Sequence, residues 1–169
     1  FIYAPFNDLE AVRSKITDKT AAIMLEPIQG EGGINVASEA FITGLKQICD
    51  EKNILLMFDE IQTGMGRTGK MFCYQHYNVT PDVMVLAKTL GGGFPIGAMV
   101  AGRKTADILQ PGTHASTFGG SPLACAASLA VFEAIEKGKL VDKAVKRGRY
   151  LYNRLSLLKK DFPFVKLIR

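Results

Sequence analysis

The sequence predicts an α/β fold with a mostly parallel sheet flanked by helices. Short apolar runs at residues 20–26, 54–58 and 83–87 have the length and composition of strands. Helical patterns precede or separate these runs, and strands that alternate with helices are typical of parallel β-α-β units. The run at 83–87 shows no polar alternation, which indicates a strand covered on both faces. A further strand is predicted at 164–168.

Capping residues and periodic apolar side chains predict two helices in the first part of the chain. Asn7 or Asp8 can accept hydrogen bonds at the start of a short helix. Ser38 begins a longer helix that runs to about Glu51, and Asn53 ends it. The apolar residues between these ends keep helical spacing, so this helix is expected to pack one face against the sheet.

Two consecutive helices are predicted in the last part. Ser121 is placed to cap the first of them, Pro122 occupies the first helical position, and Gly138 ends it. The second, over about residues 140–159, carries its apolar side chains on one stripe. We expect residues 1–137 to belong to one domain and residues 138–169 to lead from it toward another domain.

The remaining segments are predicted to be loops or short irregular elements. Glycine-rich or polar loops are expected at 26–33, 61–69 and 111–120. Residues 71–77 favour a short helix or turn, and residues 105–109 favour a short helix. The glycine-rich stretch at 61–69 could cradle a phosphate, although it matches neither the dinucleotide fingerprint nor the Walker pattern.

Composition excludes several classes of function. The chain is 47% hydrophobic and 22% charged, which is ordinary for a soluble globular protein. No secretory signal and no apolar run of bilayer length is present, so we expect a cytoplasmic protein without a membrane partner. The net charge of +5 comes mainly from lysines and arginines in 137–160. We interpret these as the solvated face of a helix, and no nucleic-acid motif accompanies them.

The cysteines and histidines predict no metal site. Cys49, Cys73 and Cys125 are odd in number and far apart, so we expect reduced thiols in or near the core. His76 and His114 fall at no ligand spacing with them. The chain starts inside apparent structure and stops inside a strand-like run, so we expect it to be a piece of a larger protein.

Polar side chains follow each of the three strand candidates. Glu26, Asp59 and Lys88 stand at the carboxyl ends of these runs, and in a doubly wound sheet such ends share one edge. Apolar sequence flanks Lys88 on both sides, so we expect a buried amine with a lowered pKa that can attack an aldehyde. The alternative is that Lys88 reaches water, Asp59 caps the next turn and Glu26 is a solvated loop charge.

A buried lysine and a buried carboxylate fit pyridoxal 5'-phosphate. This cofactor needs a lysine for its aldehyde, an acid for its pyridinium nitrogen and anion ligands for its phosphate. The sequence of these residues therefore favours a cofactor site at the predicted sheet edge.

Four motifs, in this order along the chain, resemble the class III (omega) aminotransferases. They are E-P-I-Q-G-E-G-G at 26–33, L-L-M-F-D-E-I-Q-T-G-M-G-R-T-G at 55–69, A-K-T-L-G-G-G-F-P-I-G-A at 87–98 and H-A-S-T-F-G-G-S-P-L-A-C at 114–125. Within that family, the glycine run at 91–93 and the G-M-G-R-T-G loop at 64–69 are most similar to the bacterial acetylornithine type. The resemblance implies the central part of the large domain of a fold type I pyridoxal-phosphate enzyme. Residues 138–169 would then lead into the small C-terminal domain.

The resemblance also implies roles for individual residues. Lys88 matches the lysine that forms the Schiff base with the cofactor and moves the substrate proton. Asp59 matches the carboxylate that pairs with the pyridinium nitrogen, and Gln62 matches the amide near the ring hydroxyl. Thr117 matches the threonine that reaches the cofactor phosphate of the neighbouring subunit in a homodimer. Ser116 is an adjacent candidate for the same contact.

Two acids match residues near the substrate. Glu26 and Glu31 lie in the first motif, and Glu31 matches an acid that pairs with a substrate-binding arginine in ornithine-type enzymes. That pairing would let one site accept two unlike substrates. The family's phosphate-binding turn and ring-stacking aromatic precede this chain's first residue, and its carboxylate-binding arginine follows the last one. The segment alone is therefore expected to be inactive.

The implied activity is transfer of an amino group from N2-acetylornithine to 2-oxoglutarate, a step of arginine biosynthesis. Ornithine, 4-aminobutyrate or another omega-amine are alternative donors within the family. Two readings from other classes also remain. One is a nucleotide-binding module built on the glycine loops, and the other is a structural or regulatory protein that has lost catalysis.

Overall fold

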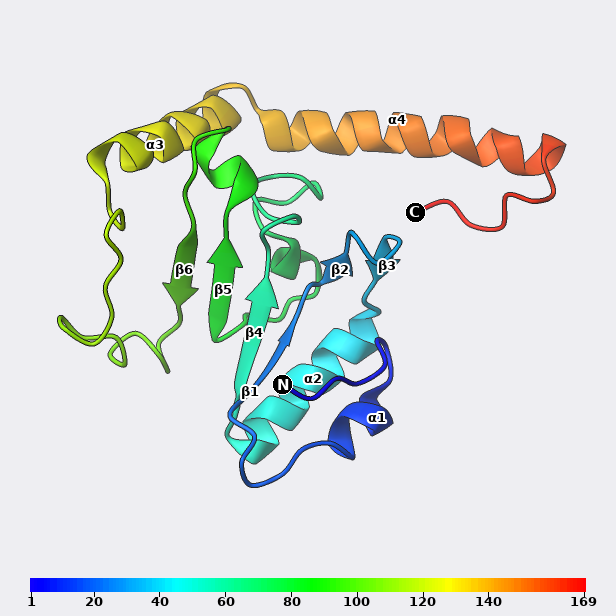
Figure 1. The fold of residues 1–169 in the computed structure, drawn as a ribbon. Coiled ribbons are helices and arrows are strands. Elements are labelled where there is room, and N and C mark those ends of the chain that lie inside the picture. Colours follow the sequence, from blue (N-terminus) through cyan, green and yellow to red (C-terminus); the bar gives the residue numbers. More distant parts are fainter.

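The computed structural model describes residues 1–169, and its centre is a four-stranded sheet in the order β1-β4-β5-β6. The strands are β1 (Ala22–Leu25), β4 (Leu55–Asp59), β5 (Val83–Leu86) and β6 (Ala98–Ala101). β1, β4 and β5 are parallel, whereas β6 pairs with β5 in the antiparallel direction (Figure 1). The α/β prediction with a mostly parallel sheet is confirmed, and the antiparallel edge strand is a feature that the sequence did not predict.

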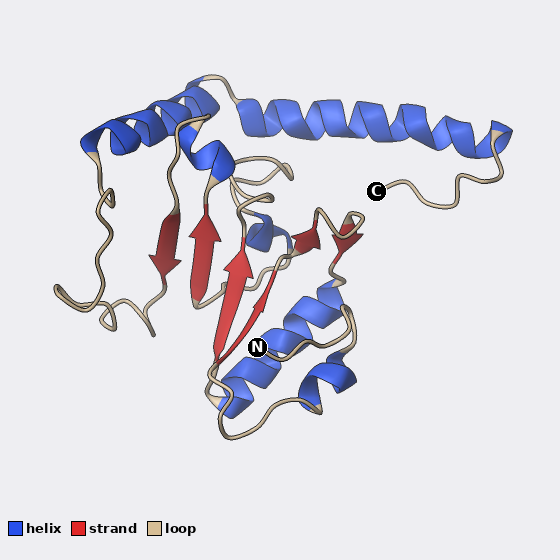
Figure 2. Cartoon of the chain, in the orientation of Figure 1, coloured by secondary structure: helices blue, strands red, loops and turns tan.

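Helices α1 (Leu9–Arg13) and α2 (Glu39–Lys52) pack beside β1 and β4 (Figure 2). The Asp8 carboxylate accepts a hydrogen bond from Ala11 N at 2.9 Å, and the Ser38 hydroxyl accepts one from Phe41 N at 3.1 Å. Both predicted caps are thus confirmed. α2 ends at Asn53, which adopts a left-handed conformation. The main core lies between these helices and the sheet and includes Ile42, Leu45, Cys49, Leu56 and Phe58.

Burial in the strands differs from the expectation. β5 is almost fully buried, as predicted, but β4 alternates between buried and half-buried residues. On β1, Met24 is 50% exposed. α1 and α2 cover one face of β1 and β4, so the alternating side chains on the other face remain accessible. β6 is exposed along its whole length, so of the apolar sequence after Lys88, Leu90 is buried but residues 98–101 are not.

The glycine-rich segment at 26–33 was predicted to be a loop, and the structure contains a small hairpin there. β2 (Ile28–Gln29) pairs with β3 (Asn35–Val36) in the antiparallel direction. Gly33 has a φ of +104°, a conformation that suits glycine, and it lies in the turn between the two strands. The hairpin is too short to be recognised by alternation of polar and apolar residues.

The second half of the chain contributes α3 (Pro122–Lys137) and α4 (Leu140–Asp161). α3 packs against the single-turn helix η2 (Lys88–Gly91) and places Ile135 and Val131 in a second apolar cluster with Leu90. α4 continues away from the sheet and has no buried residue (Figure 1). None of the helices combines the length and the apolar sequence that a membrane span requires.

Three local predictions are wrong. Residues 105–109 form turns instead of a helix, and the Thr105 hydroxyl donates to Asp82 O at 3.1 Å. Residues 164–168 form no strand, since no neighbouring strand lies beside them to pair with. Ser121 stands at the predicted cap position of α3, but its side chain makes no capping hydrogen bond.

The short helix η1 (Cys73–His76) confirms the short helix or turn predicted at 71–77. Of the three cysteines, Cys49 and Cys73 are buried in the core as expected. Cys125 is exposed on α3 and does not belong to the core.

Candidate active site

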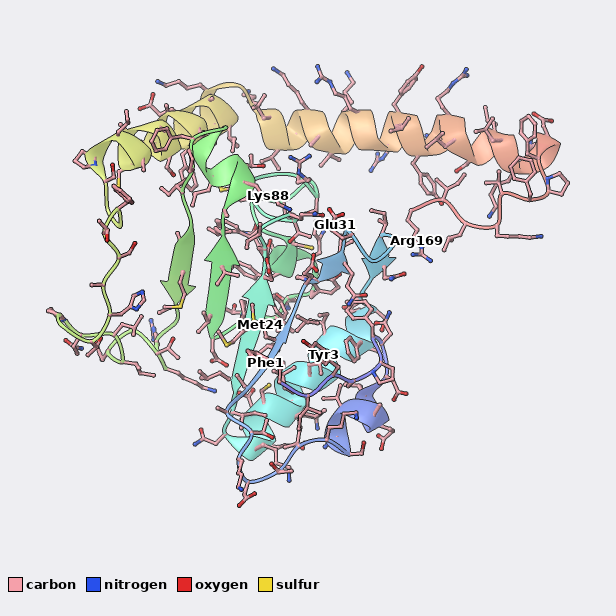
Figure 3. The ribbon with its side chains drawn as sticks, in the orientation of Figure 1. Phe1, Tyr3, Met24, Glu31, Lys88 and Arg169 are labelled. Carbon is pink, nitrogen blue, oxygen red and sulfur yellow. The ribbon has the colours of Figure 1, made fainter.

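The carboxyl ends of the three parallel strands meet at one edge of the sheet. Glu26 follows β1 directly, Asp59 is the last residue of β4, and Lys88 stands two residues beyond β5. Asp59 is aligned with Val85 of β5 in the sheet register. The arrowheads of these strands point toward the same side in Figure 1, which is the side where Lys88 is labelled in Figure 3. The prediction that these three residues share an edge is confirmed.

Lys88 has an unusual backbone conformation at this edge. Its φ is +47°, in the left-handed region that non-glycine residues rarely adopt. Such a conformation costs on the order of 1 kcal/mol and persists only where the surroundings enforce it. Here the following turn enforces it, because Leu90 N donates to Ala87 O at 2.9 Å and the Leu90 side chain is buried. Residues held in such conformations cluster at functional sites.

The expected burial of Lys88 is wrong for this chain. Its side chain is exposed, as is the strand β6 further along the chain, whereas Leu90 and Gly91 in the turn that follows it are buried. The apolar flanks predicted burial, but those side chains pack below the lysine or face solvent. The chain therefore provides no apolar layer over Nζ, and activation by burial has no basis in these residues alone.

The Asp59 carboxylate has one oxygen engaged and one available. Oδ1 accepts a hydrogen bond from Ile61 N at 2.9 Å, so the alternative role as a turn cap is also real. Oδ2 accepts no hydrogen bond within the chain, and the residue is half-buried. A carboxylate oxygen that is free at the end of a strand fits the protonated nitrogen of a pyridine ring.

Gln62 and Glu31 are joined directly, although 30 residues separate them in the sequence. Gln62 Nε2 donates to Glu31 Oε1 at 2.8 Å. Gly30 lies against the same amide, and a Cβ at that position would collide with the Gln62 side chain. The β2–β3 hairpin and the loop after β4 are thereby held together beside the strand ends, with Glu31 on the hairpin (Figure 3).

The three glycine amides of the stretch at 61–69 bond to nearby backbone carbonyls. Gly66 N donates to Met71 O at 3.0 Å, and Gly69 N donates to Gly66 O at 3.2 Å. Its side chains reach outward instead, since Arg67 Nη2 donates to Thr89 Oγ1 at 3.3 Å, one residue beyond Lys88. Amides that are already bonded within the turn do not form a phosphate cradle, which argues against a nucleotide-binding loop here.

Ser116 and Thr117 are not brought together with the other candidates. They lie in the exposed loop between β6 and α3, on the side of the sheet away from the β2–β3 hairpin (Figure 1). Their side chains make no hydrogen bond to any other candidate residue. Glu26 is half-buried and also makes no side-chain hydrogen bond.

Two further residues lie at the site that the sequence did not identify. The guanidinium of Arg169 donates from Nη1 to Gly33 O at 3.1 Å, Ile34 O at 2.8 Å and Asn35 Oδ1 at 2.9 Å (Figure 3). No local pattern could reveal a contact across more than 130 residues. Glu60, next to Asp59, is buried, and its position directly after a buried strand was the signal available.

Comparisons with known proteins agree with this geometry. The model of the family described as aminotransferase class-III matches residues 3–169. The chain belongs to the class III aminotransferase family. An acetylornithine aminotransferase of Methanocaldococcus jannaschii is 53% identical over 169 residues, which are 100% of this chain and 42% of that protein. One of Caldanaerobacter subterraneus subsp. tengcongensis is 52% identical and is covered over 43% of its length.

Solved class III structures share the fold. The ornithine delta-aminotransferase of Plasmodium falciparum has a TM-score of 0.88 at 40% identity, covering 95% of this chain and 42% of that one. The acetylornithine aminotransferase of Elizabethkingia anophelis has a TM-score of 0.87 at 40% identity, covering 95% of this chain and 41% of that one. The chain thus spans less than half the length of these class III relatives.

Proposed function

We propose that the full-length protein is a pyridoxal-phosphate-dependent enzyme that moves an amino group from N2-acetylornithine to 2-oxoglutarate. The observation that carries this proposal is the placement of an amine, Lys88, and a half-free carboxylate, Asp59, at neighbouring strand ends in a class III chain. The names of the relatives at 52–53% identity support the choice of donor. Arginine biosynthesis is the metabolic setting that this choice implies.

The residues present fit the cofactor by their chemistry. When bound, pyridoxal phosphate supplies a conjugated ring that accepts the electron pair of a C–H bond broken next to the amino nitrogen. Lys88 Nζ holds the cofactor and moves the proton from that carbon. Asp59 Oδ2 accepts the pyridinium N–H and keeps that proton on the ring, because a nearby carboxylate favours the charged form.

The other candidates have supporting parts in the proposal. Gln62 orients its amide toward the ring hydroxyl while it holds Glu31, and Glu26 and Glu31 face the substrate. Thr117, with Ser116 beside it, reaches the cofactor phosphate of a second subunit in a homodimer. The exposure of that loop in a single chain leaves both side chains accessible to a second subunit.

The remaining parts of the proposal concern the whole protein. Residues 1–137 belong to the large domain, and residues 138–169 lead into a small C-terminal domain. The protein acts in the cytoplasm, and the 169-residue segment alone is inactive, because it spans less than half the length of the aminotransferases that it matches.

Ornithine is the second candidate donor. Solved ornithine aminotransferases from Plasmodium falciparum and Plasmodium yoelii share the fold at 40% identity. Turnover of acetylornithine, ornithine and 4-aminobutyrate by the same preparation distinguishes these donors, and we expect acetylornithine to have the highest kcat/KM.

The test is an absorbance spectrum of the full-length protein with pyridoxal phosphate, before and after N2-acetylornithine is added. We expect a band near the visible edge that shifts when the amine is added. A band that ignores acetylornithine but responds to another amine would contradict the donor. Absence of any band would contradict the cofactor.

Lys88→Ala sharpens this test. The variant should lose the band, whereas Lys70→Ala, which removes another exposed lysine from the neighbouring loop, should keep it. A Lys88→Ala protein that kept both the band and its response would refute the role of this amine. Asp59→Ala should slow the half-reaction by several orders of magnitude, since the ring then loses its proton.

A further inference from the structure

Glu60 is a buried carboxylate that no part of the proposed chemistry uses. It follows Asp59 directly, is 1% exposed and is one of the largest fully buried side chains. Its carboxylate accepts hydrogen bonds from Cys73 N at 2.6 Å, Tyr74 N at 2.8 Å and Thr63 Oγ1 at 3.2 Å. Two of these donors are the first amides of η1, which a helix start leaves without partners.

All three donors of Glu60 are uncharged, and no ion pair reaches it. Burial raises the pKa of Glu60, and the three hydrogen bonds act in the opposite direction. An acid in such a place destabilises the fold unless its hydrogen bonds are all made. We therefore ask which contacts the carboxylate makes beside Asp59 that an apolar side chain could not make.

The Glu60 carboxylate connects the two ends of the loop that follows it. Cys73 and Tyr74 directly follow the segment 61–72, and Thr63 lies near its start, so the side chain of Glu60, the residue before the segment, joins its two ends. The Glu60 backbone is itself fixed, since its N–H donates to Val85 O at 3.0 Å and its carbonyl accepts from Gly64 N at 2.8 Å. A Cβ on Gly64 would lie 2.8 Å from the Glu60 carbonyl oxygen, so the loop packs tightly against this residue.

The fastened segment carries two contacts of the candidate site. Gln62 donates to Glu31 on the hairpin, and Arg67 donates to Thr89 beside Lys88. Both contacts depend on where the segment lies, because neither Gln62 nor Arg67 belongs to a helix or strand.

We propose that Glu60 is a positioning residue whose carboxylate holds segment 61–72 closed, so that Gln62 and Arg67 stay against the Glu31 hairpin and the Lys88 turn. The consequence for cofactor binding rests on the proposed function, whereas the closure itself does not.

The first test measures closure without cofactor. Hydrogen exchange of segment 61–72 is followed in the full-length apoprotein, in the wild type and in Glu60→Gln. The glutamine keeps one acceptor oxygen but turns an NH2 group toward donors, so at least one η1 amide loses its partner. We expect exchange in the segment to become about tenfold faster.

A matched control lies at the opposite end of the same strands. Asp82 is also buried, and its carboxylate accepts a hydrogen bond from Leu56 N at 2.9 Å. Asp82→Asn removes a buried charge, which lies 3.7 Å from Lys104 Nζ, without touching segment 61–72. We expect it to lower the melting temperature while exchange in 61–72 stays at the wild-type rate. An equal increase of exchange in 61–72 in both variants would mean that Glu60 only stabilises the fold in general, and it would overturn the proposal.

The second test asks whether closure matters to the site. The dissociation constant of pyridoxal phosphate, read from visible absorbance of the full-length protein, should rise about tenfold in Glu60→Gln and less than about twofold in Asp82→Asn. Unchanged binding and exchange in Glu60→Gln would overturn the proposal. If the wild type shows no cofactor band while segment 61–72 exchanges faster in Glu60→Gln, the proposed function is refuted. The proposal that Glu60 holds the segment closed then still stands.

Thr63 keeps the test decisive if Glu60→Gln does not fold. Thr63→Val removes one hydroxyl donor at nearly constant volume, and Thr63→Ser keeps it. Exchange in 61–72 should rise in the valine variant and return toward the wild-type rate in the serine variant. Equal rates in the two variants would contradict a role for the carboxylate's hydrogen bonds.

Discussion

Residues 1–101 and residues 102–169 differ sharply in how they bury their apolar side chains. Of the buried hydrophobic residues, only Ala124 and Ile135 come from the second part. Helix α2 in the first part has five buried residues, whereas the longer helix α4 in the second part has none. Both helices have an apolar stripe in the sequence. An apolar stripe therefore indicates which face of a helix seeks a partner, but it does not say whether this chain provides that partner.

The largest expected difference between the two parts is in the reactivity of their cysteines. Burial raises the pKa of Cys49 and of Cys73 to about 12. At pH 8 only about one in ten thousand of these thiols is ionised, and the thiolate is the reactive form. Iodoacetamide should therefore modify the exposed Cys125 more than about a thousandfold faster in the native chain, as measured by peptide mass spectrometry.

Unfolding in urea provides the control for this experiment, because all three thiols should then react at similar rates. Rapid modification of Cys49 in the native chain would contradict the packing of the first part.

A pair of leucines tests the same contrast by stability. Leu45 on α2 is 1% exposed, whereas Leu151 on α4 is 56% exposed. Leu45→Ala should lower the free energy of unfolding by about 2–5 kcal/mol, because it leaves a cavity in the core. Leu151→Ala should change it by less than about 0.5 kcal/mol. Urea unfolding of the 169-residue chain measures both, and similar losses would mean that α4 packs against the rest of the chain.

The two serines that precede α2 and α3 are expected to show a smaller difference in their contribution to stability. The Ser38 hydroxyl accepts from Phe41 N, whereas Ser121 makes no capping hydrogen bond. Ser38→Ala should cost about 1 kcal/mol, and Ser121→Ala should be nearly neutral. The two alanine variants can be compared by thermal unfolding. A larger loss of stability in Ser121→Ala than in Ser38→Ala would mean that the Ser121 hydroxyl caps α3, in contradiction to the structure.

The smallest expected effect concerns the acid buried in the first part. Burial raises the folded-state pKa of Glu60 above its ordinary value of 4.5, so protonation favours the folded state. The stability that Glu60 contributes is full below pH 4.5 and is lost as the pH rises through its folded-state pKa. The difference in unfolding free energy between wild type and Glu60→Gln should thus fall as the pH is raised from about 4 to 7. A difference in unfolding free energy that grows with pH would contradict a raised pKa of Glu60.

The sequence predicted those elements whose signals are local. Asp8, Ser38 and Asn53 mark helix ends by their own hydrogen bonds or backbone conformation, and the strand ends at Asp59 and Lys88 follow from short apolar runs. These features were found without any knowledge of what packs where.

Features that depend on distant partners were not predictable. The β2–β3 hairpin is too short for a periodic pattern, and the strand predicted at 164–168 has no neighbour to pair with. Lys88 was expected to be buried because its sequence neighbours are apolar, yet its side chain is exposed while its neighbours Leu86 and Leu90 are buried. The contacts of Glu60 with η1 join residues that are 13 and 14 positions apart, and only the structure reveals them.

The measurement that tests the central claim most directly is borohydride reduction of the full-length protein in the presence of pyridoxal phosphate, followed by peptide mass spectrometry. Reduction fixes the cofactor permanently to the amine that holds it. We predict a pyridoxyl group on Lys88, with Lys70 and Lys104 unmodified. Labelling of a different lysine, or of none, would contradict the assignment of Lys88 as the residue on which the site depends.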